Sequence, residues 1–528
     1  MKTITINRRK TTFFSELANQ INDNQEALEK YIQAPFSMAN FEQQIALKQK
    51  QFSIEQRTLL HEIVSKQMSA YSHFDKVAKN IDLLKEEDTF TVTAGHQLNV
   101  FGGPLYVIYK IMDAVRLAEK LKTTYPDKNF VPVFWIASED HDFEEINHLH
   151  LFGSTFSWET EQKGPVGRFS LEGIERLKAD ILSKFGNNPE YSEYLDQFYK
   201  NGNLAEASTE FMMNLMGAYG LITLNADDAQ LKASFAPILK REIETQFSEK
   251  EVAKTTQQLE EDGFHGQAMA RPINLFYIKD QFRERIIPLE EGNFEIGETT
   301  IEKVDLLKEL ESHPERFSPN VILRPLYQEF ILPNLCYIGG GGEMAYWLQF
   351  KGMFDQTGVP FPLVKVRNSV QWFDKSTIKR IDKLNLNYTD VFESIHEVKK
   401  QYVLDNAELE LDFTVLEQKL ADLIHELEHA IIAVDKGMEG YAKSESTKIQ
   451  KQLDNVQQKM IRHQKKKNED AMKQIDGIYA RLFPNNGLQE RYDNMIPLMG
   501  KYGPKEFVQA VYEMIDPDEK ELILVLEE

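Results

Sequence analysis

The stretch TFTVTAGHQLNVFGGPLYVIYK (89–110), followed by VPVFWIA (131–137), decides the fold of this chain. Residues 89–93 are short and β-branched, which is typical of a strand. Pro104 suits the first turn of a helix, because the N–H group that proline lacks would have no partner there. We expect a helix over about 104–121 and a second strand over 131–137. Because both strands are nearly all apolar, this βαβ unit predicts a parallel sheet covered on both faces.

More strands are expected outward from this unit. GLITLN (220–225) predicts a third core strand, and apolar runs at 321–323, 335–338 and 361–366 predict others. INLFYI, RERIIPL and NFEIG, between 264 and 300, predict β-hairpins. We therefore predict an α/β fold whose doubly wound core (89–375) is interrupted by connective insertions at about 152–215 and 240–320.

The two ends of the chain differ from this core. Residues 1–88 have helical periodicity and are expected to pack on the core as helices. Residues 376–480 predict an α-helical coiled-coil hairpin that turns at 435–440, because apolar residues step by about 3.5 positions on either side. The two series are Leu416, Leu420, Leu423, Leu427, Ile431 and Val434, then Ile449, Leu453, Val456 and Met460. Surplus apolar surface on such a hairpin favours a homodimer, and residues 481–528 are expected to return to the core.

Composition narrows the class of protein. Among 528 residues, 83 Asp and Glu outnumber 61 Lys and Arg, for a net charge of −22. A field of that sign repels phosphate backbones, so we expect no nucleic acid as partner. No run approaches about 18 apolar residues, and the N-terminus lacks the apolar core of a secretory signal. We expect a cytoplasmic protein with no membrane partner.

The loop after the first strand contains Gly95, His96 and Gln97, then Gly102 and Gly103. In open parallel sheets, ligands bind beyond the carboxyl ends of strands. The glycines permit close backbone approach, and the following helix N-terminus could hold an anion. The alternative is a tight strand-to-helix turn with no ligand.

The loop after the second strand reads Ser138-Glu139-Asp140-His141-Asp142. Acids at this position could hold an ammonium group, a magnesium ion or a proton in transfer. The alternative is helix capping, which explains one or two of these acids more easily than the whole run.

Three other features invite a functional interpretation. The glycine run 339–342, followed by Glu343 and Tyr346, again follows a strand and could cradle a ligand at Gly340 and Gly341. His425–His429 matches the HExxH zinc-protease pattern, but it lies in the hairpin without a third ligand, so we predict no metal site there. Cys336 lies in an apolar strand and is expected to be structural.

These motifs resemble the BshC family, the cysteine-adding enzymes of bacillithiol biosynthesis. The matching stretches, which span most of the chain in order, are AGHQLNVFGGPLYVIYK (94–110), PVFWIASEDHDFEEIN (132–147), DGFHGQ (262–267), RPLYQEFILPNLCYIGGGGEMAYWLQFK (324–351), VKVRNS (364–369), RHQKKK (462–467) and LFPNNGLQER (482–491). The resemblance implies a Rossmann-like core similar to class I aminoacyl-tRNA synthetases, with connective insertions and a dimerising coiled coil. It also implies a ligase that joins cysteine to glucosaminyl-malate.

The chemistry of an amide bond then assigns roles. ATP is the expected co-substrate, with Mg²⁺ as a candidate companion and no tightly bound cofactor. We expect the 95–104 loop, Tyr106 and Lys110 to handle phosphate or carboxylate groups, and His265 to lie at the substrate site. His96, Asp140 and His141 are the catalytic candidates, with either histidine as the base.

Another strand end completes this set of candidate residues. Arg367, Asn368 and Ser369 could bind the malate carboxylates. A nucleotide- or metabolite-binding protein without catalysis, or a dimeric scaffold, remains the alternative on the same fold.

Overall fold

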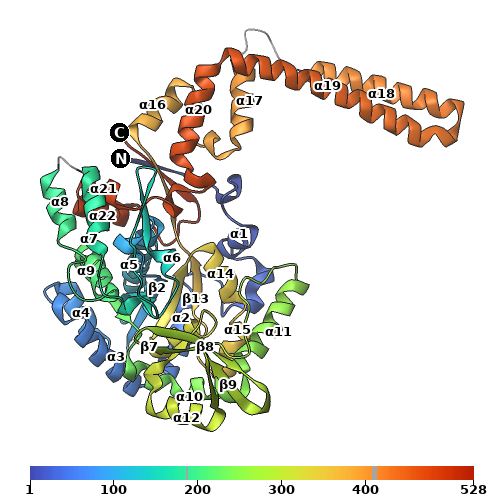
Figure 1. Ribbon diagram of the computed structural model, residues 1–528. Coiled ribbons are helices and arrows are strands. Elements are labelled where there is room, and N and C mark those ends of the chain that lie inside the picture. Colours follow the sequence, from blue (N-terminus) through green and yellow to red (C-terminus); the bar gives the residue numbers. More distant parts are fainter. Residues whose placement is uncertain (186–187, 407–412) are drawn as a thin grey trace.

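The structure is a computed structural model that describes residues 1–185, 188–406 and 413–528 (Figure 1). A five-stranded parallel sheet forms its centre, in the order β13-β12-β2-β3-β6. These strands are β2 (Thr89–His96), β3 (Asn129–Ile136), β6 (Ile222–Asn225), β12 (Asn334–Gly339) and β13 (Leu363–Val366).

The order of the strands makes the core doubly wound. From β2 the chain passes through α5 (Tyr106–Thr124) to β3 and then outward to β6. It later returns to β12, on the other side of β2, and continues to β13. The predicted βαβ unit and the Rossmann-like α/β fold are therefore confirmed, and the direction of winding changes between β2 and β12.

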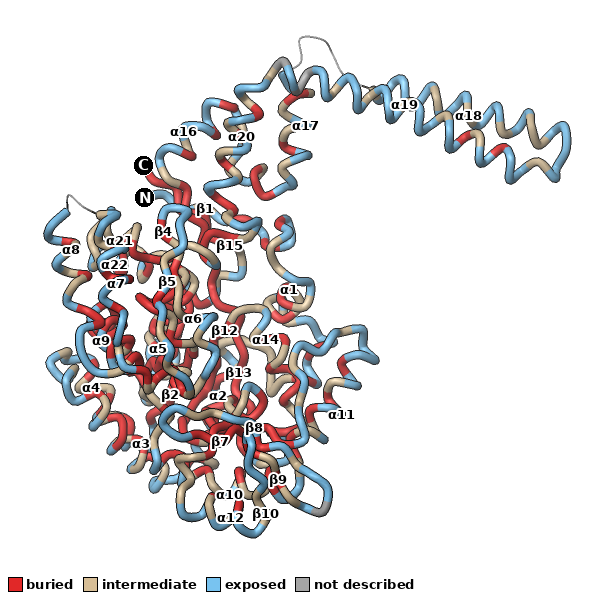
Figure 2. Tube along the Cα trace, in the orientation of Figure 1, coloured by how far each residue is buried: buried red, intermediate tan, exposed pale blue. Residues whose placement is uncertain are grey.

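Helices cover both faces of the central sheet, because alternate residues of each strand point to opposite sides. From β3, Phe134 and Ile136 pack in a cluster with α5, α9 (Leu204–Met216) and α22 (Pro504–Met514). On the other face, Val133 and Trp135 join a cluster with α3 (Ile54–Gln67), α10 (Ala229–Thr245) and α13 (Arg324–Ile331). Nearly every core-strand residue is consequently buried (Figure 2).

The insertion before β12 forms a second, antiparallel sheet in the order β10-β9-β8-β7-β11. Its strands are β7 (Leu275–Lys279), β8 (Phe282–Pro288), β9 (Asn293–Ile296), β10 (Thr299–Glu302) and β11 (Phe317–Pro319). In the sequence, α11 (Phe247–Glu261) precedes this sheet, and α12 (Lys303–Ser312) lies between β10 and β11. The predicted hairpins are confirmed.

The prediction of a strand at 321–323 is wrong, because these residues form a turn that leads into α13. The Asn320 side chain accepts a hydrogen bond from the Ile322 amide at 2.9 Å, and its carbonyl accepts one from the Arg324 amide at 2.8 Å. A side chain that binds the backbone amides in place of a neighbouring strand favours a turn over a strand.

A third sheet joins the two ends of the chain, in the order β1-β15-β14. β1 (Lys2–Ile6) is antiparallel to β15 (Leu522–Leu526), which is parallel to β14 (Ser369–Phe373). The expectation that residues 1–88 are helical is therefore wrong at its start: the alternating KTITI pattern is a strand whose partner lies at the far end of the sequence. The rest of that segment contains the helices α1 (Glu16–Asn22), α2 (Asn40–Gln51), α3 and α4 (Asp75–Leu83).

The predicted coiled-coil hairpin is confirmed and projects away from the core (Figure 1). It consists of α18 (Thr414–Val434) and α19 (Glu439–Lys467), joined at 435–438. Its base is formed by α16 (Lys375–Lys383), α17 (Ile395–Asp405) and α20 (Glu469–Leu482). Most of the hairpin is exposed (Figure 2). Among the described residues, no helix is long and apolar enough to cross a membrane.

Candidate active site

A cleft of about 520 Å³ lies at the carboxyl ends of β2, β3 and β12. This is the edge of the sheet where the winding direction changes, and where ligands bind in open α/β sheets. The loops after these three strands therefore meet at one edge of the sheet. Of the predicted site residues, the cleft is lined by Gly95, His96, Gln97, Tyr106, Glu139, Asp140, His141, Glu343 and Tyr346.

Glu343 occupies the β12 side of the cleft and is saturated with hydrogen bonds. Lys110 Nζ donates to both carboxylate oxygens, at 2.8 and 2.6 Å. The Tyr337 hydroxyl donates to Oε1 at 2.9 Å, and the Gly340 amide donates to Oε2 at 2.8 Å. Burial raises the pKa of this carboxyl, but Lys110 outweighs burial and the net pKa lies below its usual value.

Lys110 is only 1% exposed and also donates to the Gly95 carbonyl at 2.5 Å. The expectation that it meets a phosphate or carboxylate of the substrate is therefore corrected: its ammonium group is fully engaged beneath the cleft, where it orients Glu343 and the end of β2.

His96 lies between these groups and the aromatic ring of Tyr106, with ring centroids 5.2 Å apart. Burial, with the positive charges of Lys110 and Arg367, lowers the pKa of His96 to about 3. Its Nε2 is buried without a hydrogen-bond partner among the described residues. The ring is thus neutral at pH 7, as a base must be, but a group this weakly basic is a poor proton acceptor.

Asp140 and His141 form the middle of the cleft with Gln97. Gln97 Nε2 donates to Asp140 Oδ2 at 2.9 Å, and the His141 amide donates to Oδ1 at 2.8 Å. Burial raises the pKa of Asp140, but hydrogen bonds from His141 and Gln97, together with the charge of Arg283, bring it well below its usual range. Asp140 is consequently a permanent anion at neutral pH.

The tautomer of His141 follows from its contact with Arg283. Arg283 Nη1 lies 2.5 Å from His141 Nδ1. Because a guanidinium group can only donate, Nδ1 accepts, and the neutral ring carries its proton on Nε2. His141 in this arrangement is a hydrogen-bond donor toward a ligand, and it has no free lone pair with which to act as a base.

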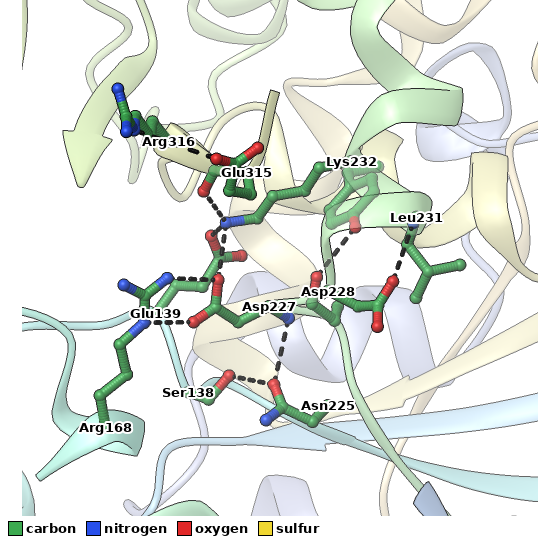
Figure 3. A network of polar contacts seen from close by, with 12 residues as sticks. Ser138, Glu139, Arg168, Asn225, Asp227, Asp228, Leu231, Lys232, Glu315 and Arg316 are labelled. Atoms are coloured by element: carbon green, nitrogen blue, oxygen red, sulfur yellow. Dashed lines mark hydrogen bonds and ion pairs between the residues drawn. The ribbon is translucent and has the colours of Figure 1, made fainter. Parts of the chain in front are cut away.

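Glu139 belongs to a separate network of charges behind the β3 end of the cleft (Figure 3). Lys232 Nζ lies 2.6 Å from Glu139 Oε1 and donates to Asp227 Oδ1 at 2.8 Å. Arg168 binds Asp227 through two hydrogen bonds, at 2.8 and 3.0 Å. Burial and the neighbouring Asp227 raise the pKa of Glu139, against the opposing effect of Lys232.

Four arginines in the cleft were missed by the sequence interpretation. Arg283 and Arg285 alternate on β8, Arg271 precedes β7, and Arg324 begins α13. The Arg283 guanidinium lies 3.8 Å from the Phe276 ring centroid. The sequence contained a signal for three of these arginines. Arg324 stands in the RPLYQEF motif, and the alternation of RER at 283–285 places Arg283 and Arg285 on one face of a strand.

Other predicted residues lie outside the cleft. The Gly102 and Gly103 amides donate to the Asn99 and Val100 carbonyls, so they do not form the expected anion cradle. Both glycines have positive φ, +78° and +69°, which explains why the sequence uses glycine there. The loop is a tight turn packed against Asn494, whose side chain donates to the Gly103 carbonyl at 2.7 Å.

Arg367, Asn368 and Ser369 are buried, and the expectation that they bind malate is not supported by their position. Arg367 donates to Glu490 at 2.8 Å, and Asn368 donates through its side chain to the Glu519 carbonyl at 2.9 Å. The Arg367 guanidinium lies 4.8 Å from the ring centroid of Tyr106 and therefore supports the cleft from behind.

Gly340, Gly341, Asp142 and His265 also lie outside the cleft lining. Gly341 faces α1, where an added Cβ would lie 2.5 Å from the Cβ of Ala18, and Asp142 and His265 are exposed. Cys336 is buried, with its thiol pKa raised by burial, as expected for a structural cysteine.

The candidate metal chemistry has little support in the geometry. Across residues 1–185, 188–406 and 413–528, no group of three or more His, Cys, Asp or Glu side chains is arranged to hold a metal ion. His425 and His429 lie on the exposed face of α18, with ring centroids 4.6 Å apart. The Asp140 and Glu343 carboxylates already accept hydrogen bonds from lysine, tyrosine and amide donors, and they are not arranged to bind Mg²⁺.

Comparison with known proteins agrees with this architecture. Residues 1–368 match the family described as "Bacillithiol biosynthesis BshC, N-terminal Rossmann-like domain", and residues 370–526 match "Bacillithiol biosynthesis BshC, C-terminal coiled-coil domain". The chain belongs to the BshC family. The boundary between the two matches falls at the start of β14, where the chain leaves the central sheet.

Relatives of this BshC chain match over nearly its whole length. The protein named "Putative cysteine ligase BshC" from Flavobacterium johnsoniae is 41% identical over 94% of both chains. That of Flavobacterium psychrophilum is 39% identical over 98% of both. This BshC chain is thus a ligase of bacillithiol biosynthesis. A solved "putative arginyl t-RNA synthetase" from Campylobacter jejuni covers 87% of this chain and 99% of its own at 10% identity, but its TM-score of 0.21 carries no argument.

Proposed function

We propose that this BshC protein forms the amide bond between the carboxyl group of L-cysteine and the amine of glucosaminyl-malate. The observation that carries the proposal is the mixture of charges that lines the cleft. Acidic residues at the end of β3 line it together with an arginine wall formed by Arg271, Arg283, Arg285 and Arg324. A substrate that bears both an amine and two carboxylates can find a partner for each group in such a cleft.

The arginine wall supports binding of the malate carboxylates. Arg324 donates to the neutral amide of Gln328 at 3.0 Å, and its guanidinium lies near the rings of Trp135 and Tyr337. A guanidinium that is fixed by neutral groups keeps its charge available for a ligand. Asp140, which also lines the cleft, is a fixed anion that can attract the ammonium group of cysteine.

The bond itself requires activation of the cysteine carboxyl group. We propose that ATP supplies it, giving cysteinyl adenylate and pyrophosphate, after which the glucosaminyl amine displaces AMP. His141, with its proton on Nε2, can donate a hydrogen bond to the carbonyl oxygen as negative charge develops there. We further propose that the protein works as a homodimer in the cytoplasm, where ATP and cysteine are available.

Mass spectrometry of a reaction mixture tests this function. Purified protein with cysteine, glucosaminyl-malate and ATP is expected to yield bacillithiol, and omission of any one reactant should abolish it. Bound substrates without product would favour the alternative of a metabolite-binding protein. Neither binding nor product would favour a scaffold.

Arginine variants sharpen this test. We expect Arg324→Gln to raise the KM for glucosaminyl-malate by about tenfold to hundredfold, with little change for cysteine, because a charge-assisted hydrogen bond worth ~1.5–3 kcal/mol is lost. The matched control is Arg176→Gln, since Arg176 is 82% exposed on α7 (Ile174–Leu182) and is not one of the residues that line the cleft. Equal effects of both variants, or none from Arg324→Gln, would contradict carboxylate binding at the arginine wall.

A further inference from the structure

The transfer of cysteine to an amine needs a proton acceptor, and most acids and histidines of the cleft are unsuited to that role. Both oxygens of Glu343 accept two hydrogen bonds each. Both oxygens of Asp140 accept hydrogen bonds, and His141 accepts one from Arg283 on Nδ1. His96 is buried with a strongly lowered pKa. A base drawn from Glu343, Asp140 or His141 would first have to break an existing contact, and His96 is too weakly basic to accept the proton.

Glu139 is placed differently. Its side chain lines the cleft and is 13% exposed, so a ligand can reach it. Lys232 Nζ lies 2.6 Å from Oε1, and that oxygen is itself buried. Oε1 therefore faces the lysine, and Oε2 is the oxygen that remains to accept a proton from a ligand.

Lys232 is shared between Glu139 and two other acceptors. Lys232 is 1% exposed and directs its three N–H groups to three acceptors: Glu139, Asp227 and the Glu315 carbonyl (Figure 3). Asp227, 2.8 Å from Lys232 Nζ, also accepts two hydrogen bonds from Arg168. Asp227 therefore competes with Glu139 for the one lysine and adds a negative charge behind it.

We infer that Glu139 is the base that takes the proton from the attacking amine, and that Asp227 sets its basicity by sharing Lys232. This inference rests on the proposed ligase function and assigns one step within it. The neutral amine attacks the carbonyl carbon of cysteinyl adenylate, and a C–N bond forms. The surplus proton on nitrogen passes to Glu139. The C–O bond breaks, AMP leaves with its electron pair, and Glu139 returns the proton to solvent.

The charges that face Glu139 come from five elements. They are Lys232 on α10, Asp227 in the turn after β6, Arg168 on the turn 166–168, Arg283 on β8 and Tyr327 on α13. Arg283 and Arg168 stay cationic and Tyr327 stays neutral at working pH. Removing the Lys232 charge raises the Glu139 pKa, whereas removing the Asp227 charge lowers it.

Two activity measurements on Glu139→Gln test the inference. Cysteine-dependent exchange of pyrophosphate into ATP reports activation, and amide formation reports transfer. We expect exchange within about twofold of the wild type and amide formation lowered by about a hundredfold or more, since a general base contributes that much. Glu139→Asp should recover part of the transfer rate. Wild-type transfer by Glu139→Gln, or equal loss of both activities, would overturn the inference.

The pH profile supplies a readout that a merely structural role would not move. Asp227→Asn should shift the acidic limb of kcat/KM for the amine to lower pH by about one unit, and Lys232→Met should shift it to higher pH by a similar amount. Asp228→Asn is the matched control, because Asp228 caps α10 through the amides of Gln230 and Leu231 and should leave the limb in place.

The outcomes separate this inference from the function on which it rests. A wild-type protein that forms no product overturns the ligase proposal, and the inference with it. An active wild type whose acidic limb stays fixed in Asp227→Asn and Lys232→Met, or moves in the same direction in both, overturns the inference alone. Thermal melting identifies any variant that fails to fold. If one of Asp227→Asn and Lys232→Met fails to fold, the pH profile of the other still tests the inference.

Discussion

Asp140 illustrates how one residue serves both stability and chemistry. Its carboxylate joins the loop after β2 to the loop after β3, through Gln97 and the His141 amide. Removing its charge while keeping its shape therefore affects the ligand and the loops together.

We predict that Asp140→Asn lowers kcat/KM for cysteine by about tenfold to a thousandfold, as for a charged contact worth ~1.4–4 kcal/mol in the transition state. Because the folded pKa of Asp140 lies below its unfolded value, its carboxylate stabilises the fold above about pH 4, and this contribution disappears as the pH falls through the folded pKa. Chemical denaturation at several pH values should thus show the wild type and Asp140→Asn converging in acid. Wild-type kinetics, or a stability difference that grows in acid, would contradict this role.

The candidate site shows which residues a sequence can assign. The strand-end residues Gly95, His96 and Asp140 could be placed at one edge, because parallel strands share a direction and their carboxyl ends must meet. The arginine wall could not be placed there from the sequence, because Arg283 and Arg285 come from an antiparallel insertion. The way in which this insertion packs on the core leaves no local sequence pattern. Arg367 was misplaced for the same reason: its partner Glu490 lies 123 positions along the chain.

Among the elements, α14 (Gly341–Leu348) explains the glycine run better than a ligand does. α14 begins at Gly341 and packs against α1. At Gly341 an added Cβ would lie 2.5 Å from the Ala18 Cβ, whereas at Gly342 nothing lies within 4 Å. One glycine is required by helix packing, and its neighbour is not.

We predict opposite effects for two otherwise identical substitutions in α14. Gly341→Ala should lower the free energy of unfolding by about 1–3 kcal/mol, because the helices must move apart. Gly342→Ala should raise it by up to about 1 kcal/mol, because alanine favours the helix and meets no neighbour. Urea denaturation of both variants checks this, and an equal or reversed effect would show that the α1–α14 contact does not constrain the glycine run.

At the scale of elements, the sequence periodicities were sufficient for the βαβ unit and the long hairpin, where the pattern is strong and extends over many residues. They failed at Lys2–Ile6 and at 321–323. In the first case the partner strand is β15, at the opposite terminus. In the second, the Asn320 side chain captures the backbone amides that a strand would have used. Both errors concern short segments whose structure is decided by a neighbour and not by their own pattern.

At the scale of the whole molecule, the hairpin is an arm with uncovered apolar surface. Several large side chains of the predicted apolar series remain exposed on a single chain: Leu416 at 52%, Leu423 at 59%, Val434 at 82% and Val456 at 54%. Burying such side chains stabilises an association by about 25 cal/mol for each Å² of apolar surface. A coiled coil that leaves part of its apolar series open is suited to a second copy of itself.

We therefore predict a homodimer that assembles through α18 and α19. Leu416→Glu combined with Leu423→Glu should give monomers in multi-angle light scattering, because two charges per chain would have to be buried without partners. The core should keep its melting temperature, since α18 has no buried residue of its own. Gln418→Glu, on the exposed polar surface of the same helix, adds a charge without removing an apolar side chain and should remain dimeric. A double variant with an unchanged mass in solution would show that the apolar surface of the hairpin has a different partner.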